Sequence, residues 1–277
     1  MKFWIGLGGM MLGGAVLLAP VARRGPTTGQ EQATQIVRPE GARTPVLVEL
    51  FTSEGCSSCP PADALIARLD KSQPVAGAEI IALKEHVDYW NHQGWRDPFS
   101  AAQFSKRQNA YASALGSHQV YTPQMVVDGR AEFVGSSEYE ARQAIAAAAR
   151  AVKLPIHLEW APRAAAESIS LQVRVDAAGQ LPRDDAAEVL LAITEDGLHS
   201  DVLRGENAGR KFEHYAVVRE LKRIGSIPAQ SPAAFTSQPN VALDKAWKRE
   251  NLRAVVFVQE VRSRRVLGAA SLRVPVN

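Results

Sequence analysis

The sequence predicts an α/β domain followed by an antiparallel β domain, and two observations support this prediction. A buried, β-branched run at 46–51 ends in a turn at Gly55, and both cysteines of the chain, Cys56 and Cys59, follow at the start of a helical pattern. From Leu154 onward, short segments alternate apolar and polar residues. A Cys-x-x-Cys pair between a strand and a helix is the redox-active corner of a thioredoxin-like fold, so we expect that fold for the first domain.

The first 22 residues predict export from the cytoplasm. Lys2 precedes an apolar, uncharged run at 3–22, and Arg23-Arg24 close it. A positive start, an apolar stretch and small residues before cleavage are typical of a signal peptide. A run of about twenty residues is also long enough to be an uncleaved membrane anchor. Both interpretations place the rest of the chain in the periplasm or otherwise outside the cytoplasm, with residues 23–44 as a flexible tether.

Residues 45–153 are expected to form the thioredoxin-like domain, with one helical insertion. Asp128-Gly129 between two short apolar runs is a strong signal for a β-hairpin. Pro60 and Pro61 lack N–H groups and are tolerated in the first turn of a helix, which favours a helix that starts at the cysteines. In chain order the expected elements are a strand at 45–51, a helix to about residue 71, a strand at 79–83, a helix at about 100–115, strands at 124–127 and 131–135, and a helix from 137 to about 152.

Residues 154–277 are expected to form an antiparallel β-sandwich-like domain or a small barrel, because short alternating strands separated by Gly, Pro and Asn are typical of both. Nothing in this second domain has the pattern of a catalytic site. We expect its polar residues His199, Asp201 and His214 in turns or on strand surfaces. The expected strands are at 156–160, 168–175, 188–194, 212–221, 254–261 and 266–274.

The two cysteines carry the predicted chemistry. Cys56, the outer one, should be the nucleophile, because unpaired N–H groups and the helix dipole at a helix start favour a thiolate. Cys59, buried behind it, should be the resolving thiol. Ser57 and Ser58 bring no positive charge, and Glu54 would raise the pKa of Cys56 if it lay close. We therefore expect a moderately activated thiolate and an intermediate redox potential.

Thr122-Pro123 is the expected second half of the site. In thioredoxin-like folds a cis proline at the start of the hairpin packs opposite the dithiol, and the preceding residue binds the substrate backbone. Only X–Pro bonds adopt the cis form at modest cost. A trans proline at an ordinary strand start is the alternative, and the position directly before the hairpin favours cis.

His86 and Asp88 should share one face of a strand end, beside the dithiol. Together with Trp90 and Tyr121 they are candidate substrate-binding residues, and His86 or Asp88 would assist proton transfer. The alternative, which we favour for the histidine, is a hydrogen-bonded side chain among packed aromatic residues. Three residues of the inserted helix would face either the same cleft or the surface: Arg107, Gln108 and Tyr111.

Other classes of function fit the sequence less well. The net charge of +3 without a basic block argues against nucleic-acid binding. A purely structural disulfide across so short a loop would constrain the unfolded chain little. The two thiolates with His86 or His92 would make a copper or zinc site, but the six histidines have no recognisable spacing with the cysteines. The sequence has neither the Gly-x-Ser-x-Gly elbow of a hydrolase nor a phosphate-binding glycine loop, and no cofactor is expected.

Three segments are long and specific: 49–63 with its Cys-Ser-Ser-Cys-Pro-Pro-Ala-Asp motif, 86–90 and 120–124. Together with 205–219 they resemble a bacterial family of exported, thioredoxin-like proteins catalogued as a domain of unknown function. The resemblance covers most of the chain from about residue 45. It implies a thioredoxin-like fold and a location in the cell envelope, and it implies no substrate.

The sequence thus predicts a thiol–disulfide oxidoreductase of the cell envelope that acts on protein disulfides or thiols. Because the chain has only two cysteines, a separate redox partner protein must recharge the pair. The first rival interpretation is a copper carrier that uses the dithiol. The second is a non-catalytic module that binds a partner through the β domain.

Overall fold

The computed structural model describes residues 41–117, 119–161, 168–176, 185–231 and 233–276. The predicted signal or anchor at 1–22 and the tether up to residue 40 lie outside the described residues. Among the helices of the described part, none has the length and apolar character needed to span a bilayer.

Strand β1 (Thr44–Thr52) is the centre of the first half of the fold. It pairs in parallel with β2 (Ala78–His86) and antiparallel with β3 (Gln124–Val127), and β4 (Ala131–Val134) follows at the sheet edge. The β3–β4 turn is Asp128-Gly129, and both residues have positive φ, at 50° and 60°. Val127 pairs with Ala131, so the loop has three residues, 128–130, and Asp and Gly are there because they adopt positive φ more readily than most residues.

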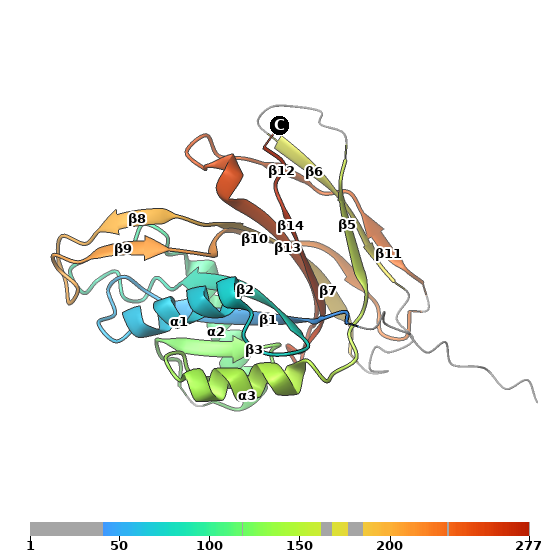
Figure 1. Ribbon diagram of the computed structural model, residues 1–277, viewed down its shortest axis with the longest axis horizontal. Helices are drawn as coiled ribbons and strands as arrows, with labels where there is room; N and C mark the ends of the chain where they lie inside the picture. The colour runs from blue at the N-terminus through green and yellow to red at the C-terminus, as the bar shows by residue number, and fades with distance from the viewer. Residues whose placement is uncertain (1–40, 118, 162–167, 177–184, 232, 277) are drawn as a thin grey trace, which may run out of the picture. The chain divides into compact units, whose positions relative to one another are not determined.

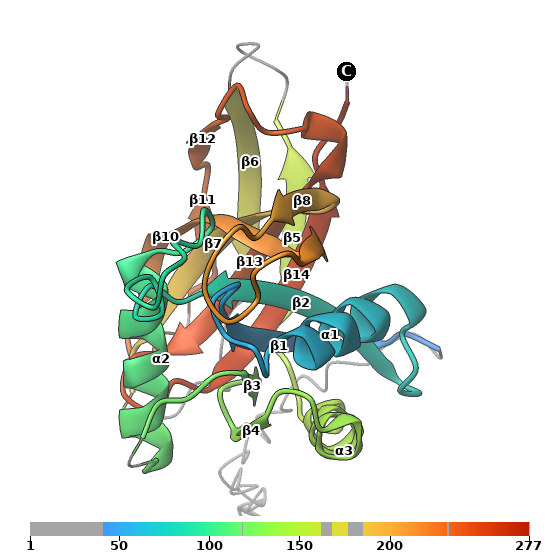
Figure 2. The same cartoon turned by 90° about the vertical axis from the view of Figure 1, so that its left-hand side faces the viewer.

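Three helices cover the two faces of this part of the sheet. Alternate residues of β1 point to opposite faces, so Val46 and Val48 pack with α1 (Pro60–Ser72) and α3 (Glu138–Ala148). Leu47 packs on the other face with α2 (Ala102–Leu115). Figure 2 shows α2 on the opposite side of β1 and β2 from α1 and α3. Burial on both faces is why β1 reads as a continuous apolar run.

The same sheet continues into the second half of the chain. Its strand order is β14-β13-β7-β10-β2-β1-β3-β4, and the two halves meet through the parallel pair Val217–Lys84. The sheet therefore contains strands from both sides of residue 153. The second-half strands in it are β7 (Ala187–Glu195), β10 (Val217–Ile227), β13 (Leu252–Glu260) and β14 (Val266–Arg273).

A smaller sheet packs on the second half of the large one. Strand β6 (Ser168–Val175) pairs with β5 (Ile156–Trp160) along one edge, and short strands pair with the other edge (Figure 1). Apolar residues of β6 and of β7 and β13 form one core between the two sheets. The remaining short elements are β11 (Phe235–Ser237), β12 (Asn240–Ala242) and the 3₁₀ turn η1 (Arg249–Asn251).

Strands β8 (Leu198–Asp201) and β9 (Lys211–His214) form a separate two-stranded hairpin. The predicted strand at 212–221 is wrong, because the chain breaks between β9 and β10 at Ala216, where φ is 53°. The carboxylate of Asp196 accepts the Ala216 N–H and holds this break. The break turns the hairpin away from the large sheet and toward the start of α1 (Figure 1).

A buried group of charged side chains joins α2 to the sheet. The guanidinium of Arg107 binds the Glu49 carboxylate (2.6 Å), the Gln259 amide (2.9 Å) and the Tyr111 hydroxyl (2.9 Å). Glu85 lies beside them with Arg107 Nε at 3.4 Å, and neither of its buried oxygens accepts a hydrogen bond among the described residues. Arg107 and Tyr111 thus point neither into a cleft nor to the surface, but inward, where they tie α2 to β1.

Replacing Glu85 with glutamine should stabilise the protein at neutral pH. Burial, and then the charge of Glu49, raise the pKa of Glu85 well above its usual range. The folded state therefore keeps a proton that the unfolded chain loses above about pH 4.5, so this group costs stability as pH rises. We expect the stability difference between E85Q and the parent to grow with pH, by up to about 1.4 kcal/mol per pH unit. Urea unfolding of both chains between pH 4 and 8 measures it; a constant difference would contradict the expectation.

Candidate functional site

Cys56 and Cys59 form a disulfide at the start of α1, with their Cα atoms 5.4 Å apart. Cys59 is the N-cap residue of that helix, and Pro60-Pro61 open its first turn as expected. A tight turn connects the end of β1 to Cys56: the Cys56 N–H donates to the Ser53 carbonyl at 3.1 Å, and the Gly55 N–H donates to the Ser53 hydroxyl at 3.1 Å. The buried strand therefore fixes where the disulfide lies.

The expectation that Cys56 lies outermost is wrong, because Cys56 and Cys59 are both 0% exposed. The loop between β8 and β9, which we call the 202–210 segment, lies against the cysteine turn. The Asn207 side-chain amide donates to the carbonyls of Glu54 (2.8 Å) and Cys56 (2.9 Å). The Glu206 carboxylate accepts the N–H of Ser57 at 3.1 Å. Residues 150 positions away in the sequence thus complete the site.

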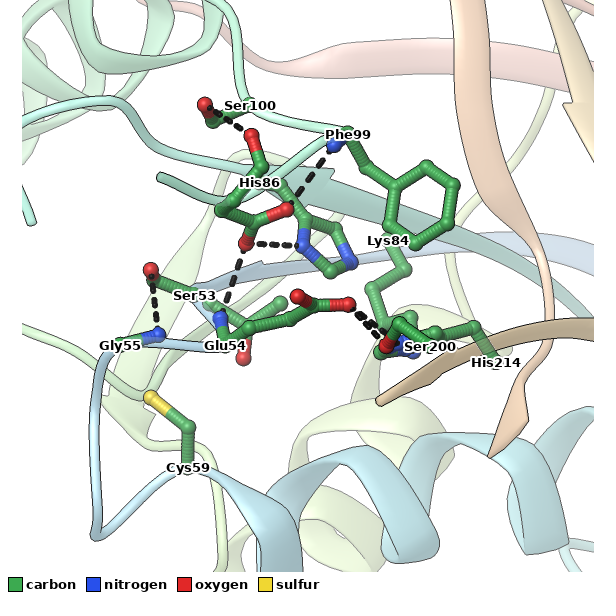
Figure 3. Close-up of polar contacts among 12 residues, drawn as sticks. Ser53, Glu54, Gly55, Cys59, Lys84, His86, Phe99, Ser100, Ser200 and His214 are labelled. Carbon is green, nitrogen blue, oxygen red and sulfur yellow. Dashed lines mark hydrogen bonds and ion pairs between the residues drawn. The ribbon is translucent and has the colours of Figure 1, made fainter. Parts of the chain in front are cut away.

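Glu54 is the centre of a buried hydrogen-bond network beside the disulfide. Its carboxylate accepts from the Trp95 indole (2.7 Å), from His214 Nε2 (2.9 Å) and from the Ser200 hydroxyl. In Figure 3 this carboxylate points away from Cys59 and toward the β8–β9 hairpin. The carboxylate expected to raise the pKa of Cys56 is therefore held by donors on another side of the turn.

The network continues from His214 to α1. Nδ1 of His214 lies 2.8 Å from Lys84 Nζ, and Lys84 lies 3.6 Å from Asp63, one turn after Cys59. Burial lowers the pKa of His214, the hydrogen bond that His214 donates to Glu54 opposes this shift, and the neighbouring Lys84 lowers the pKa further. Burial also lowers the pKa of Lys84, while Asp63 opposes that shift. With Nδ1 facing a lysine and Nε2 facing a carboxylate, the imidazole is assigned as the neutral Nε2–H tautomer.

His86 is buried and pairs with Asp97, with Nδ1 2.7 Å from the carboxylate. Burial raises the pKa of Asp97, but His86 together with the N–H groups of Glu54 (2.8 Å) and Phe99 (2.9 Å), which donate to the carboxylate, lowers it below its usual value. Asp88 does not share this site: its carboxylate accepts from the Ser105 hydroxyl of α2 at 2.5 Å. The candidate pair His86 and Asp88 is thus divided, and the hydrogen-bonded interpretation of His86 is correct.

The Thr122–Pro123 bond is cis, as the sequence predicts. Pro123 and Ala62 both lie 3.2 Å from the position that a Cβ on Gly135 would take, so the proline is close to the first turn of α1. The Trp90 indole donates to the Thr122 hydroxyl at 2.8 Å.

Trp90 also connects the proline loop to the cysteine turn. A Cβ on Gly55 would lie 3.3 Å from Trp90 Cβ, which shows how closely the two loops pack. Tyr121 points elsewhere, and its hydroxyl donates to Glu132 at 2.5 Å. Trp90 therefore lies against the cysteine turn, whereas the Tyr121 hydroxyl is bound to the β3–β4 hairpin.

The residues around Glu54 and the cysteine turn that were not among the sequence candidates include Asp97, Ser200, Asn207 and His214. The prediction that His214 lies in a turn or on a strand surface is wrong, since it is 2% exposed. Within the part of the chain that the structure describes, no group of three His, Cys, Asp or Glu side chains is placed to hold a metal ion.

Comparisons with known proteins give a family and a fold. A family model described as "Protein of unknown function (DUF1223)" matches residues 47–259. A crystal structure of an Agrobacterium tumefaciens protein is 24% identical with a TM-score of 0.64, covering 85% of this chain and 96% of that one. HBP35 of Porphyromonas gingivalis is 14% identical with a TM-score of 0.63, covering 84% and 76%. At these identities the likeness shows a shared fold alone, and no curated protein matches.

Proposed function

The chain belongs to the family of proteins of unknown function DUF1223, and we propose from the geometry of its own site that it carries out thiol–disulfide exchange with other proteins. The observation that carries the proposal is the Cys56–Cys59 disulfide at the start of α1, next to the cis Thr122–Pro123 bond. In this proposal residues 45–153 are a thioredoxin-like domain in which α2 is the insertion. The parallel pairing of β1 with β2 and the antiparallel β3–β4 hairpin support it.

The proposed reaction starts from the reduced dithiol. The Cys56 thiolate attacks one sulfur of a substrate disulfide, forms a mixed disulfide and releases the first substrate thiolate. The Cys59 thiolate then attacks the Cys56 sulfur, which releases the second substrate thiolate and leaves the Cys56–Cys59 disulfide. Two electrons pass to the substrate, and the two protons of the dithiol end on the released thiols. A separate protein dithiol must then reduce the pair, because the chain has no further cysteine.

The polar network gives the site groups that can hold protons during these steps. Asp63, on the helix that follows Cys59, connects through the buried Lys84 to the buried His214. A proton released or taken up by the dithiol needs such groups, since burial keeps bulk water away from both sulfurs. The proposal also includes export, because disulfide exchange of this kind operates where disulfides persist; cell fractionation that finds the chain only in the cytoplasm would contradict it.

Reduction of insulin by dithiothreitol tests the proposed reaction. The parent protein should accelerate it, and Cys56→Ser should lose all of this acceleration, because the attacking thiolate is gone. Ser72→Ala, at the far end of α1, serves as the matched control and should retain activity. A parent protein that is no faster than Cys56→Ser would refute the proposal.

A further inference from the structure

In the described state, no other thiol can reach the disulfide. Cys56 and Cys59 have no exposed surface, whereas exchange requires a sulfur of the partner to contact one of their sulfurs. Some part of the enclosure must therefore move before any reaction begins. The 202–210 segment is one part of that enclosure, because it contacts the cysteine turn directly.

Three hydrogen bonds hold the 202–210 segment to main-chain groups around Cys56. Asn207 donates to the carbonyls of Glu54 and Cys56, and Glu206 accepts from the N–H of Ser57. The backbone also approaches the opposite loop closely, since a Cβ on Gly205 would lie 3.1 Å from the Gln93 carbonyl. The segment therefore occupies the main-chain hydrogen-bonding positions on both sides of the reactive cysteine.

Apart from these hydrogen bonds, few buried side chains fix the 202–210 segment in place. Of its residues only Val202 and Asn207 are buried, and the apolar Leu203 is 74% exposed. Among the described residues, the backbone of the β8–β9 hairpin that carries it pairs with no other strand, and side chains at the base of the hairpin, Ser200 and His214, make its hydrogen bonds to Glu54. Regions with few buried apolar contacts open at the lowest free energy. The tip of this hairpin therefore has few buried apolar contacts to lose when it opens.

We infer that the 202–210 segment holds the place of the substrate, and that the substrate is an extended polypeptide segment carrying the reacting cysteine. The inference rests on the proposed exchange function. When the segment leaves, the carbonyl of Glu54 and the N–H of Ser57 lose their hydrogen-bond partners, and the carbonyl of Cys56 keeps only the Cys59 N–H, at 3.3 Å. A polypeptide main chain supplies both the donors and the acceptor that these groups need. A thiol as small as 2-mercaptoethanol has one hydroxyl and cannot bind all of these groups at once, so it compensates the opening much less.

Reduction of the Cys56–Cys59 disulfide in the native protein tests this inference, with 2-mercaptoethanol and with a ten-residue peptide that contains one cysteine. At equal thiolate concentration the peptide should react faster with the parent protein. Asn207→Ala removes two of the three hydrogen bonds, so the rate with 2-mercaptoethanol should rise by about tenfold. The peptide rate should rise less, and the ratio of the two rates should fall.

Asn109→Ala, an exposed amide on α2, is the matched control and should change neither rate. Glu206→Ala, at an exposed position, provides a second variant that does not depend on the buried Asn207 and should raise the 2-mercaptoethanol rate by a few-fold. Unchanged rates in both variants, or equal rates for the two thiols with the parent, would overturn the inference. These are single reductions without turnover, so a failure of the exchange function would appear only in the insulin assay.

Discussion

Replacing Cys59 with alanine is expected to leave Cys56 in long-lived mixed disulfides with its protein partners. Cys59 is the partner of Cys56 in the disulfide, and the chain has no other cysteine that could resolve the intermediate. The expected change is large, from no detectable adduct to one that survives cell lysis under acid quenching. Non-reducing gels should show it, and reduction should release partners that mass spectrometry identifies.

The control for this experiment is the double variant Cys56→Ser, Cys59→Ala, which should capture nothing. The single variant Cys56→Ser tests which sulfur the partner meets. If that chain captured the same proteins as Cys59→Ala, the assignment of Cys56 as nucleophile would be wrong. If neither single variant captured any protein, the proposed exchange with proteins would be wrong, since trapping needs only the first step.

Local sequence patterns were enough to predict those elements whose structure depends on residues that are neighbours in the chain. The apolar run of β1, the cysteine pair and Pro60-Pro61 specify a strand, a turn and a helix start within about twenty residues, and β5 and β6 have the predicted bounds. The cis form of Thr122–Pro123 followed from its place before the hairpin. In each case the residues that decide the structure are neighbours in the chain.

The remaining parts of the site depend on contacts between distant segments. His214 and Glu54 are 160 positions apart, and no alternation of apolar and polar residues marks a histidine that will meet a buried carboxylate. The break at Ala216 was not predictable from its residue type, because alanine rarely adopts positive φ. Without that break the hairpin would continue as β10, and Asn207 would not reach the cysteine turn.

Like the large sheet, the β8–β9 hairpin brings residues of the second half of the chain into contact with residues of the first half. Val217 pairs with Lys84 in the sheet, and the side chain of Lys84 meets His214 just before the break. The short stretch 214–217 thus makes a contact within the sheet and a buried polar contact, and it sets the direction in which the β8–β9 hairpin leaves the sheet. The second half of the chain therefore belongs to the site, although its sequence has no catalytic pattern.

Glu54→Ala should destabilise the protein by about 3–5 kcal/mol, which we expect to be the largest stability change of any single side chain around the disulfide. The substitution leaves the Trp95 indole, the Ser200 hydroxyl and the His214 imidazole without their buried acceptor. Each stranded donor costs about 1–3 kcal/mol. Urea unfolding at pH 7.5 measures the loss, and Glu206→Ala, at an exposed carboxylate, should cost no more than about 0.5 kcal/mol.

The pH dependence of the same variant distinguishes a lost hydrogen-bond network from a simple loss of packing. Burial lowers the pKa of His214 in the folded state, so below the unfolded value of 6.5 the unfolded chain binds a proton more readily. His214 therefore costs stability as pH falls through about 6.5. Glu54 opposes that shift through its hydrogen bond. In Glu54→Ala the loss of stability between pH 7.5 and 5.5 should therefore be steeper than in the parent, and parallel curves would show that Glu54 does not support His214.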